Sequence, residues 1–207
     1  MNSSHTHIKM CGMTQIQDVE YALELGVDAL GFIFYSNSSR NISIEKAKKL
    51  TQNIPAFVDV VAVLVNSEKE FIHRLVNELS IQYLQFHGDE DVQFCNQFNK
   101  PYIKAIRPLS AEQIQQSALE FSQASAILLD TPSQQARGGT GETFDWQIIP
   151  KEVNKAYILA GGLNENNVVD AVKLCRPHAV DVCSGVEISP GIKDHQKMSR
   201  FVKALWG

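Results

Sequence analysis

Two side chains capable of acid–base chemistry follow short apolar runs in this sequence. Cys11 ends the stretch HIKMC and is followed at once by Gly12, and Asp130 ends the run AILLD. A cysteine inside a strand or helix usually packs as a small hydrophobe, whereas one at the end of a strand can point at a ligand. We therefore treat Cys11 and Asp130 as a candidate base and a candidate acid. Thr14 is the expected N-cap of the helix after Cys11.

This pair of groups suits chemistry at a carbon atom. A thiolate at Cys11 would remove a proton from carbon while the carboxyl group of Asp130 protonates a leaving or ring oxygen. These roles require a thiol pKa lowered toward about 7 and a carboxyl pKa raised above about 4. Covalent catalysis by the thiol is the alternative, but it normally needs an adjacent histidine base, and the sequence assigns none.

Arg40 and His87 are polar residues that follow two other apolar runs. The forked guanidinium of Arg40 suits a carboxylate or a second phosphate, although a solvated surface arginine would look the same in sequence. His87 could carry a proton or bind a ligand, or it could order its loop through hydrogen bonds. It has no neighbouring His or Cys at ligand spacing, so we expect no metal here.

Two glycine-containing turns follow the last two apolar runs. Gly161 and Gly162 lie in AGGL, and Ser184 and Gly185 lie in CSGVE. Glycines let backbone amides approach an oxyanion closely, and a following helix N-terminus adds a favourable dipole. The alternative is that the glycines only shape tight turns. Because both turns stand where barrel enzymes often bind phosphate, we expect a substrate that carries a phosphate monoester.

A repeated strand–helix pattern positions these residues. Runs rich in Val, Ile, Leu, Phe and Ala alternate with amphipathic segments about every 26 residues. The expected strands are 8–11, 29–34, 59–65, 83–87, 102–106, 126–130, 156–160 and 179–183. The expected helices are 15–25, 44–53, 68–79, 111–121, 165–175 and 195–205.

Eight such units predict an α/β protein with a single (β/α)8 TIM barrel domain over residues 1–207. Enzymes of this fold build their site at the carboxyl ends of the strands. A doubly wound open sheet is the alternative, but no Gly-x-Gly-x-x-Gly turn follows the first strand. The loop 131–143 contains QQARGGTG, which is too long and Gly-rich for a simple connector, and a short helix is expected at 144–146.

The composition indicates a soluble globular protein. The chain has 207 residues, of which 44% are hydrophobic and 20% charged, with a formal net charge of −4. Its Lys and Arg residues form no basic run, which disfavours nucleic-acid binding. No apolar stretch reaches the ~18 residues that span a bilayer, and the N-terminus is polar rather than signal-like. We therefore expect a cytoplasmic protein with no membrane partner.

The four cysteines show neither a disulfide framework nor zinc-binding spacing. Cys95 and Cys175 fall in helical patterns, where packing as small hydrophobes is the expected role. Only Cys11 and Cys183 lie near expected strand ends.

At these residues the sequence resembles the phosphoribosylanthranilate isomerase family over nearly the whole chain. Each matching segment is weak alone, and their joint order is specific. The segments are KMCGMT at 9–14, GFIF at 31–34, SR at 39–40, QFHGDE at 85–90, LD at 129–130, GGTG at 138–141 with FDW at 144–146, AGGL at 160–163, and DVCSGVE at 181–187 with PGIKD at 190–194.

The resemblance implies an Amadori rearrangement of N-(5-phosphoribosyl)anthranilate in tryptophan biosynthesis, with Asp130 as general acid and Cys11 as general base. It implies that Arg40 holds the anthranilate carboxylate, that His87 lies in the binding site, and that the 138–141 loop helps to close it. The turns at Gly161-Gly162 and Ser184-Gly185 would hold the phosphate. The rearrangement is an internal redox reaction, so no nicotinamide, flavin or metal cofactor is implied.

The departures from the family pattern are small. Cys183 stands where the family more often has a small hydroxyl residue, and Ser38 precedes Ser39-Arg40 where the family frequently has a proline in its Ser-x-Arg turn. A second thiol is therefore expected near the site.

Two other functions remain as alternatives. A related isomerase of histidine biosynthesis shares the fold, but its family resemblance calls for a pair of aspartates at the two strand ends. The thiol of Cys11 at the first of these positions argues against this alternative. A non-catalytic barrel that binds a phosphometabolite is the third reading. The sequence leaves monomer and homodimer equally open.

Overall fold

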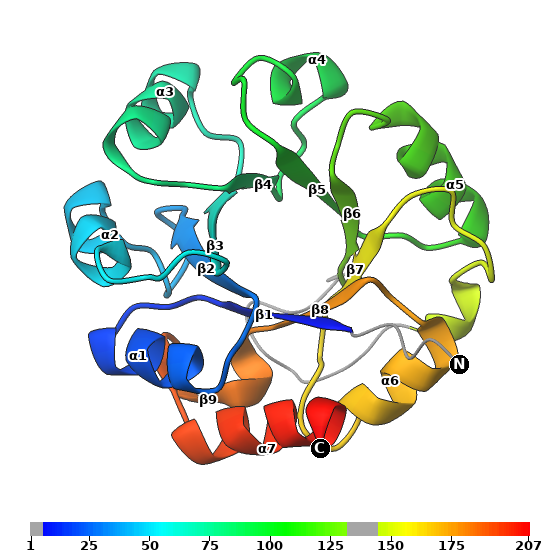
Figure 1. The fold of residues 1–207 in the computed structure, drawn as a ribbon. Coiled ribbons are helices and arrows are strands. Elements are labelled where there is room, and N and C mark those ends of the chain that lie inside the picture. The colour runs from blue at the N-terminus through cyan, green and yellow to red at the C-terminus, as the bar shows by residue number, and fades with distance from the viewer. Residues whose placement is uncertain (1–5, 132–144) are drawn as a thin grey trace.

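The computed structural model describes residues 6–131 and 145–207, which form a closed barrel of parallel strands surrounded by helices (Figure 1). The strands follow one another around the barrel in chain order, and β8 closes the ring by pairing with β1. The predicted (β/α)8 barrel is therefore confirmed. Each strand points the same way, so the carboxyl ends of all eight meet at one mouth.

The eight strands coincide with the eight predicted runs to within about one residue at each end. Cys11 is the last residue of the first strand, whereas His87, Asp130 and Cys183 lie just beyond the strands that precede them. The strands are β1 His7–Cys11, β2 Ala29–Phe34, β3 Asp59–Leu64, β4 Tyr83–Phe86, β5 Tyr102–Ile106, β6 Ala126–Leu129, β7 Tyr157–Leu159 and β8 Ala179–Val182.

The helices form the outer ring in Figure 1. They are α1 Ile16–Glu24, α2 Ile44–Thr51, α3 Lys69–Glu78, α4 Val92–Cys95, α5 Ala111–Glu120, α6 Val168–Cys175 and α7 His195–Trp206, with two 3-10 turns, η1 Trp146–Ile148 and η2 Ser184–Val186. Side chains cap several of them, for example Ser110 at α5 and Asp194 at α7, which satisfies backbone amides that have no partner within the helix.

The predicted N-cap at Thr14 is wrong. Gln15 occupies the cap position of α1 and makes no side-chain cap hydrogen bond. The hydroxyl of Thr14 donates instead to the carbonyl of Gly191, a residue far away in the sequence. A tertiary partner has replaced the local one.

A small hairpin after η2 was not predicted from the sequence. It consists of β9 Glu187–Ser189 and β10 Ile192–Lys193, which pair antiparallel around Gly191, whose φ of +83° favours glycine. The backbone amide of Lys193 donates to Asp18 of α1 at 3.0 Å. The hairpin is thereby held against the start of α1, beside the end of β1.

Apolar side chains fill both sides of the strand ring. Ile8 and Met10 of β1 belong to the large cluster between strands and helices, so their neighbours Lys9 and Cys11 face the barrel interior. The interior is lined mainly by small and branched residues, namely Val61, Ile103, Ala105, Ala126, Leu128, Ile158, Ala160 and Ala179. Polar groups on the inner face of β1 are therefore exceptions to an apolar lining. No helix in the described ranges is long and apolar enough to cross a membrane.

Candidate active site

Cys11 and Asp130 lie at the same mouth of the barrel, on strands that are not neighbours. Cys11 ends β1 and Asp130 follows β6, with β7 and β8 between them on the shorter way around the ring. The two glycine-containing turns follow those intervening strands. The topology therefore places the predicted phosphate turns between the predicted acid and the predicted base.

Cys11 is buried and stands next to an interior ion pair. Lys9, two residues earlier on the same face of β1, is 3% exposed and pairs with Asp181 at 2.9 Å. Gly31 of β2 provides the room, because a Cβ there would lie 2.7 Å from the Cys11 sulfur and 3.0 Å from Lys9 Nζ. A side chain at position 31 would displace the thiol.

Cys183 is the nearest thiol neighbour of Cys11. Strands β1 and β8 pair with Lys9 opposite Asp181 and Met10 opposite Val182, so Cys11 comes opposite Cys183 at the next step. The hydrogen bond with Cys183, together with burial, raises the pKa of Cys11 well above its usual value, and the Lys9 ammonium only partly opposes this rise. The pKa of Cys11 thus differs from the lowered value that the sequence-based mechanism required.

Asp130 forms a pair with His87, which approaches from the end of β4. Their Nε2 and Oδ2 atoms are 3.1 Å apart, and Nδ1 of the ring is 3.0 Å from the amide nitrogen of Gln85. In the orientation assigned to that amide, Nδ1 accepts and Nε2 donates to the Asp130 carboxylate. His87 therefore contacts the predicted acid directly.

The pKa of Asp130 also differs from the expectation. Burial alone would raise it, but the hydrogen bond and charge of His87, with smaller contributions from the Thr131 amide and from Arg107, lower it below its ordinary value. The free protein consequently holds a carboxylate at position 130 at neutral pH, where the general-acid role needs a proton.

Arg40 reaches the site from the loop after β2 and pairs with Glu187 in β9. Its Nε lies 2.9 Å from Oε1 and its Nη2 lies 2.5 Å from Oε2, a fork-to-fork contact. Only one edge of the guanidinium is used, since Nη1 donates no hydrogen bond to any residue in the described ranges. The Nη1–Nη2 edge thus remains available for another carboxylate.

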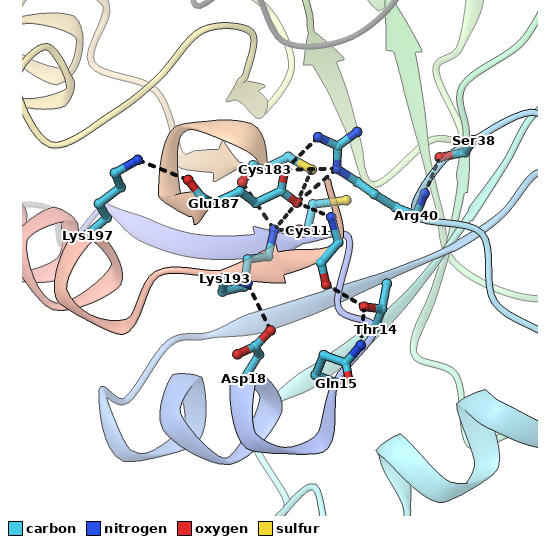
Figure 2. Close-up of polar contacts among 11 residues, drawn as sticks. Cys11, Thr14, Gln15, Asp18, Ser38, Arg40, Cys183, Glu187, Lys193 and Lys197 are labelled. Carbon is cyan, nitrogen blue, oxygen red and sulfur yellow. Dashed lines mark hydrogen bonds and ion pairs between the residues drawn. The ribbon is translucent and has the colours of Figure 1, made fainter. Parts of the chain in front are cut away.

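Glu187 and Lys193 complete this cluster, and the sequence analysis assigned neither of them a role. Lys193 Nζ, with no exposed side-chain surface, donates to the carbonyl oxygens of Cys11 at 2.5 Å and Cys183 at 3.1 Å, and to Glu187 Oε1 at 3.0 Å. Figure 2 shows the Glu187 carboxylate between Arg40 and Lys193, beside both thiols. In the sequence both residues lie in segments that match the family pattern, DVCSGVE at 181–187 and PGIKD at 190–194, but nothing in either segment indicated that the two side chains meet.

The two glycine turns pack against their neighbours very closely. A Cβ on Gly185 would lie 1.9 Å from the carbonyl oxygen of Leu163, and one on Gly161 would lie 2.1 Å from the Thr131 hydroxyl oxygen and 2.9 Å from Asp130 Oδ1. The turn after β8 therefore packs against the turn after β7, and the turn after β7 packs against Asp130. The glycines have the steric role that the sequence left open as an alternative.

The same turns also present backbone amides. Gly161 and Gly162 both have positive φ angles, of 78° and 68°. Among the described residues, the amides of Gly161, Gly162, Ser184 and Gly185 donate no backbone hydrogen bond. Such free amides beside a helical turn can bind phosphate oxygens.

Three further observations bound the site. The predicted 138–141 loop lies outside the described residues. Within those residues, no group of three or more His, Cys, Asp or Glu side chains could hold a metal ion. A cavity of about 1360 Å³ lies elsewhere, between η1, the start of β7 and the end of α6, and none of the predicted site residues lines it.

Comparison with known proteins agrees with the geometry. The family described as N-(5'phosphoribosyl)anthranilate (PRA) isomerase matches residues 8–204. The N-(5'-phosphoribosyl)anthranilate isomerase of Legionella pneumophila (strain Lens) is 62% identical over 207 residues, covering 100% of both chains. That of Pseudomonas fluorescens (strain Pf0-1) is 43% identical, covering 95% of this chain and 97% of the relative.

Solved structures show the same likeness. The crystal structure of phosphoribosyl anthranilate isomerase from Thermotoga maritima has a TM-score of 0.89 at 39% identity, covering 97% of this chain and 98% of that one. A complex of the isomerase with reduced 1-(o-carboxyphenylamino)-1-deoxyribulose 5-phosphate has a TM-score of 0.82 at 35% identity, with the same coverage. With a match along almost its whole length, this chain belongs to the N-(5'-phosphoribosyl)anthranilate isomerase family, enzymes of tryptophan biosynthesis.

Proposed function

We propose that this barrel converts N-(5'-phosphoribosyl)anthranilate to 1-(2-carboxyphenylamino)-1-deoxyribulose 5-phosphate by general acid–base catalysis at Cys11 and Asp130. One observation supports it most. A thiol and a carboxylate face one barrel mouth from β1 and β6, and two turns rich in free amides separate them. A phosphorylated sugar lying across this mouth would have its phosphate between the two groups.

In the first step the carboxyl group of Asp130 protonates the furanose ring oxygen. The C1–O bond breaks, and the nitrogen lone pair forms a Schiff base at C1. Because a bound substrate adds a phosphate and a carboxylate to the site, its negative charge raises the pKa of Asp130 and favours the protonated form. The His87 ring, which donates to Asp130, holds the carboxyl group in place.

In the second step the Cys11 thiolate takes the proton from C2. The electron pair moves into the C1–C2 bond and neutralises the iminium, which gives an enolamine that becomes the ketone. The oxidation of C2 balances the reduction of C1, so the reaction needs no external redox cofactor. The ammonium of Lys9, which lies beside Cys11, stabilises the thiolate.

Arg40 and the glycine turns orient the substrate in this proposal. Glu187 fixes the guanidinium by its Nε–Nη2 edge, so the Nη1–Nη2 edge can hold the anthranilate carboxylate in a bidentate contact. The free amides of the Gly161-Gly162 and Ser184-Gly185 turns would bind the phosphate. The distance between these two anchors sets the reacting carbons between Cys11 and Asp130.

The direct test is turnover of N-(5'-phosphoribosyl)anthranilate by purified protein without added cofactor, followed by loss of its anthranilate-type fluorescence. We expect Cys11→Ala and Asp130→Ala each to lower kcat by about 10²–10⁴-fold. Cys95→Ala, a substitution remote from the mouth, is the matched control and should keep full activity. Full turnover by both site variants would refute the assigned roles, and preference for the histidine-pathway aminoribosyl phosphate would favour the alternative isomerase.

We also propose a cytoplasmic location and a monomeric or homodimeric state. A solved relative from Thermotoga maritima is described as monomers generated from a dimeric isomerase. Cell fractionation tests the location, and light scattering at several protein concentrations distinguishes the two oligomeric states.

A further inference from the structure

The two thiols at the mouth are held together by barrel closure and by a lysine. Cys11 and Cys183 follow the register of the β1–β8 pair, and parallel neighbours of this kind lie about 4.8 Å apart along the hydrogen-bonding direction. Lys193 Nζ donates to the carbonyl oxygens of both residues, which fixes their backbones relative to each other. Figure 2 shows the side chains of Cys11 and Cys183 next to one another.

The charges around the two sulfurs are unequal. Cys183 faces Arg40 and Lys193 against one carboxylate, Glu187, whose Oε1 lies 4.0 Å from the sulfur, so two cations and one anion leave one surplus positive charge. Cys11 faces Lys9 and Asp181, which are paired with each other, so that Asp181 offsets much of the Lys9 charge, and the charge of Arg40 acts on Cys11 less than on Cys183. The surroundings therefore favour the first negative charge of the pair on the Cys183 side.

The acidities of the two thiols follow this asymmetry. The hydrogen bond from Cys11, with help from Lys193 and Arg40 and against burial, lowers the pKa of Cys183 to about 7. The same hydrogen bond raises the pKa of Cys11. Burial raises the pKa of the two remote thiols, Cys95 and Cys175, to about 12 and about 11. Only the mouth pair holds a thiolate near neutral pH.

Building on the proposed role of Cys11, we infer that Cys183 is a positioning residue that shares one proton with Cys11 and so controls when Cys11 becomes a base. At neutral pH the pair carries one proton and one negative charge. Transfer of the proton from the Cys11 sulfur to the Cys183 sulfur leaves a thiolate at Cys11, beside Lys9, without a second charge entering the site. The thiolate then takes the proton from C2, and no electrons are exchanged between the sulfurs.

Alkylation by iodoacetamide measures this ionisation independently of turnover. The reference protein is Cys95→Ala/Cys175→Ala, in which Cys11 and Cys183 are the remaining thiols. Its alkylation rate, followed between about pH 5 and 10 with the modified residue identified by mass spectrometry, should rise with an inflection near 7. Adding Cys183→Ala should abolish the inflection near 7, because Cys11 must then ionise alone, and the remaining inflection should lie more than one pH unit higher, near the ordinary thiol value of about 8.5.

The pH dependence of kcat/KM is the second measurement. In Cys183→Ala the acid limb should move upward with the alkylation inflection, and the loss of activity at pH 7 should be about tenfold and recover at high pH. Cys183→Ser, which retains a hydrogen-bond donor but does not ionise, should lie between the alanine variant and the reference.

Three results would overturn the inference. They are an unchanged alkylation inflection in both Cys183 variants, an alkylation shift without a matching shift of the acid limb, and equal loss of activity at every pH. The first result depends only on the ionisation of the two thiols, whether or not Cys11 is the base. The other two count against the inference when Cys11→Ala has lost activity, which shows that Cys11 is needed for turnover. Full activity of Cys11→Ala would instead refute the proposed function while leaving the alkylation result as it is.

Discussion

At the scale of single residues, Glu187 determines how charges are arranged at the mouth. Burial opposes its ionisation, but hydrogen bonds and charge from Arg40 and Lys193 keep its pKa below the usual value. The Glu187 carboxylate orients the Arg40 guanidinium by accepting hydrogen bonds along one of its edges, and it accepts one hydrogen bond from the Lys193 ammonium. Lys193 in turn donates to the carbonyl oxygens at the ends of β1 and β8. A single buried carboxylate thus links the predicted carboxylate-binding arginine to the two thiols.

Substituting Glu187→Gln should make the protein less stable, to a degree that depends on pH. Gln keeps the shape but leaves two buried cations uncompensated, which costs about 3 kcal/mol at pH 7. Because folding lowers the pKa of Glu187, its contribution is complete above about pH 5 and is lost as the pH falls through the folded pKa. Urea unfolding from neutral to acid pH should show the two proteins converging, and a constant difference at all pH values would contradict this account.

At the scale of elements, the turn after β7 positions the acid through steric contact. Gly161 has a φ of +78°, and a Cβ would lie 2.5 Å from the Thr131 amide nitrogen as well as near the Asp130 carboxylate. Gly26, in the turn after α1, has a similar φ of +76° with nothing within 4 Å of the same position. Alanine substitutions at Gly161 and Gly26 therefore distinguish the effect of backbone strain, which both positions share, from displacement of Asp130, which only Gly161 can cause.

Gly161→Ala should therefore lower kcat by about 100-fold, because the turn or the carboxyl group must move, whereas Gly26→Ala should leave kcat unchanged. Both should lose about 1–2 kcal/mol from left-handed backbone strain, with a further loss at Gly161 from the contact. Steady-state kinetics and urea unfolding of both variants provide the comparison. Equal kinetic effects in the two variants would mean that the turn does not position Asp130.

The elements were predictable from sequence where local pattern determines them. The strand runs are apolar because both faces are covered, and the chain places Cys11 and Asp130 at strand ends that any parallel barrel brings to one mouth. Contacts between distant segments were not predictable. Thr14 donates a hydrogen bond to Gly191, which lies 177 residues further along the chain, and Arg40 pairs with Glu187, which lies 147 residues further along. Neither the loss of the Thr14 cap nor the position of Glu187 between two cations therefore had a local signal in the sequence. A second thiol near the site was expected from the sequence, but its pairing with Cys11 depends on the closure of β1 against β8.

At the scale of the whole molecule, the barrel has a charged layer inside an apolar lining. Lys9 and Asp181 are 3% and 8% exposed and pair across β1 and β8, while the interior residues of the other strands are mainly apolar, with the uncharged Gln85 of β4 as an exception. Buried ion pairs contribute little net stability, because desolvation offsets their attraction. Stability of the fold therefore does not explain the Lys9–Asp181 pair. Its contact with Cys11 does explain it, because the Lys9 ammonium favours the Cys11 thiolate.

A double substitution tests this separation of stability from function. Lys9→Met alone should lower the free energy of unfolding by about 3–5 kcal/mol, because it leaves Asp181 buried without its partner, and Lys9→Met/Asp181→Leu should recover most of that loss. The double variant should nevertheless have a kcat at least about tenfold lower at pH 7, since the ammonium that favours the Cys11 thiolate is gone. Urea unfolding and the pH profile of kcat measured on the same three proteins decide the matter. If the double variant regained both stability and activity, the ion pair would have no role in the ionisation of Cys11, and the surplus charge near Cys183 alone would have to account for it.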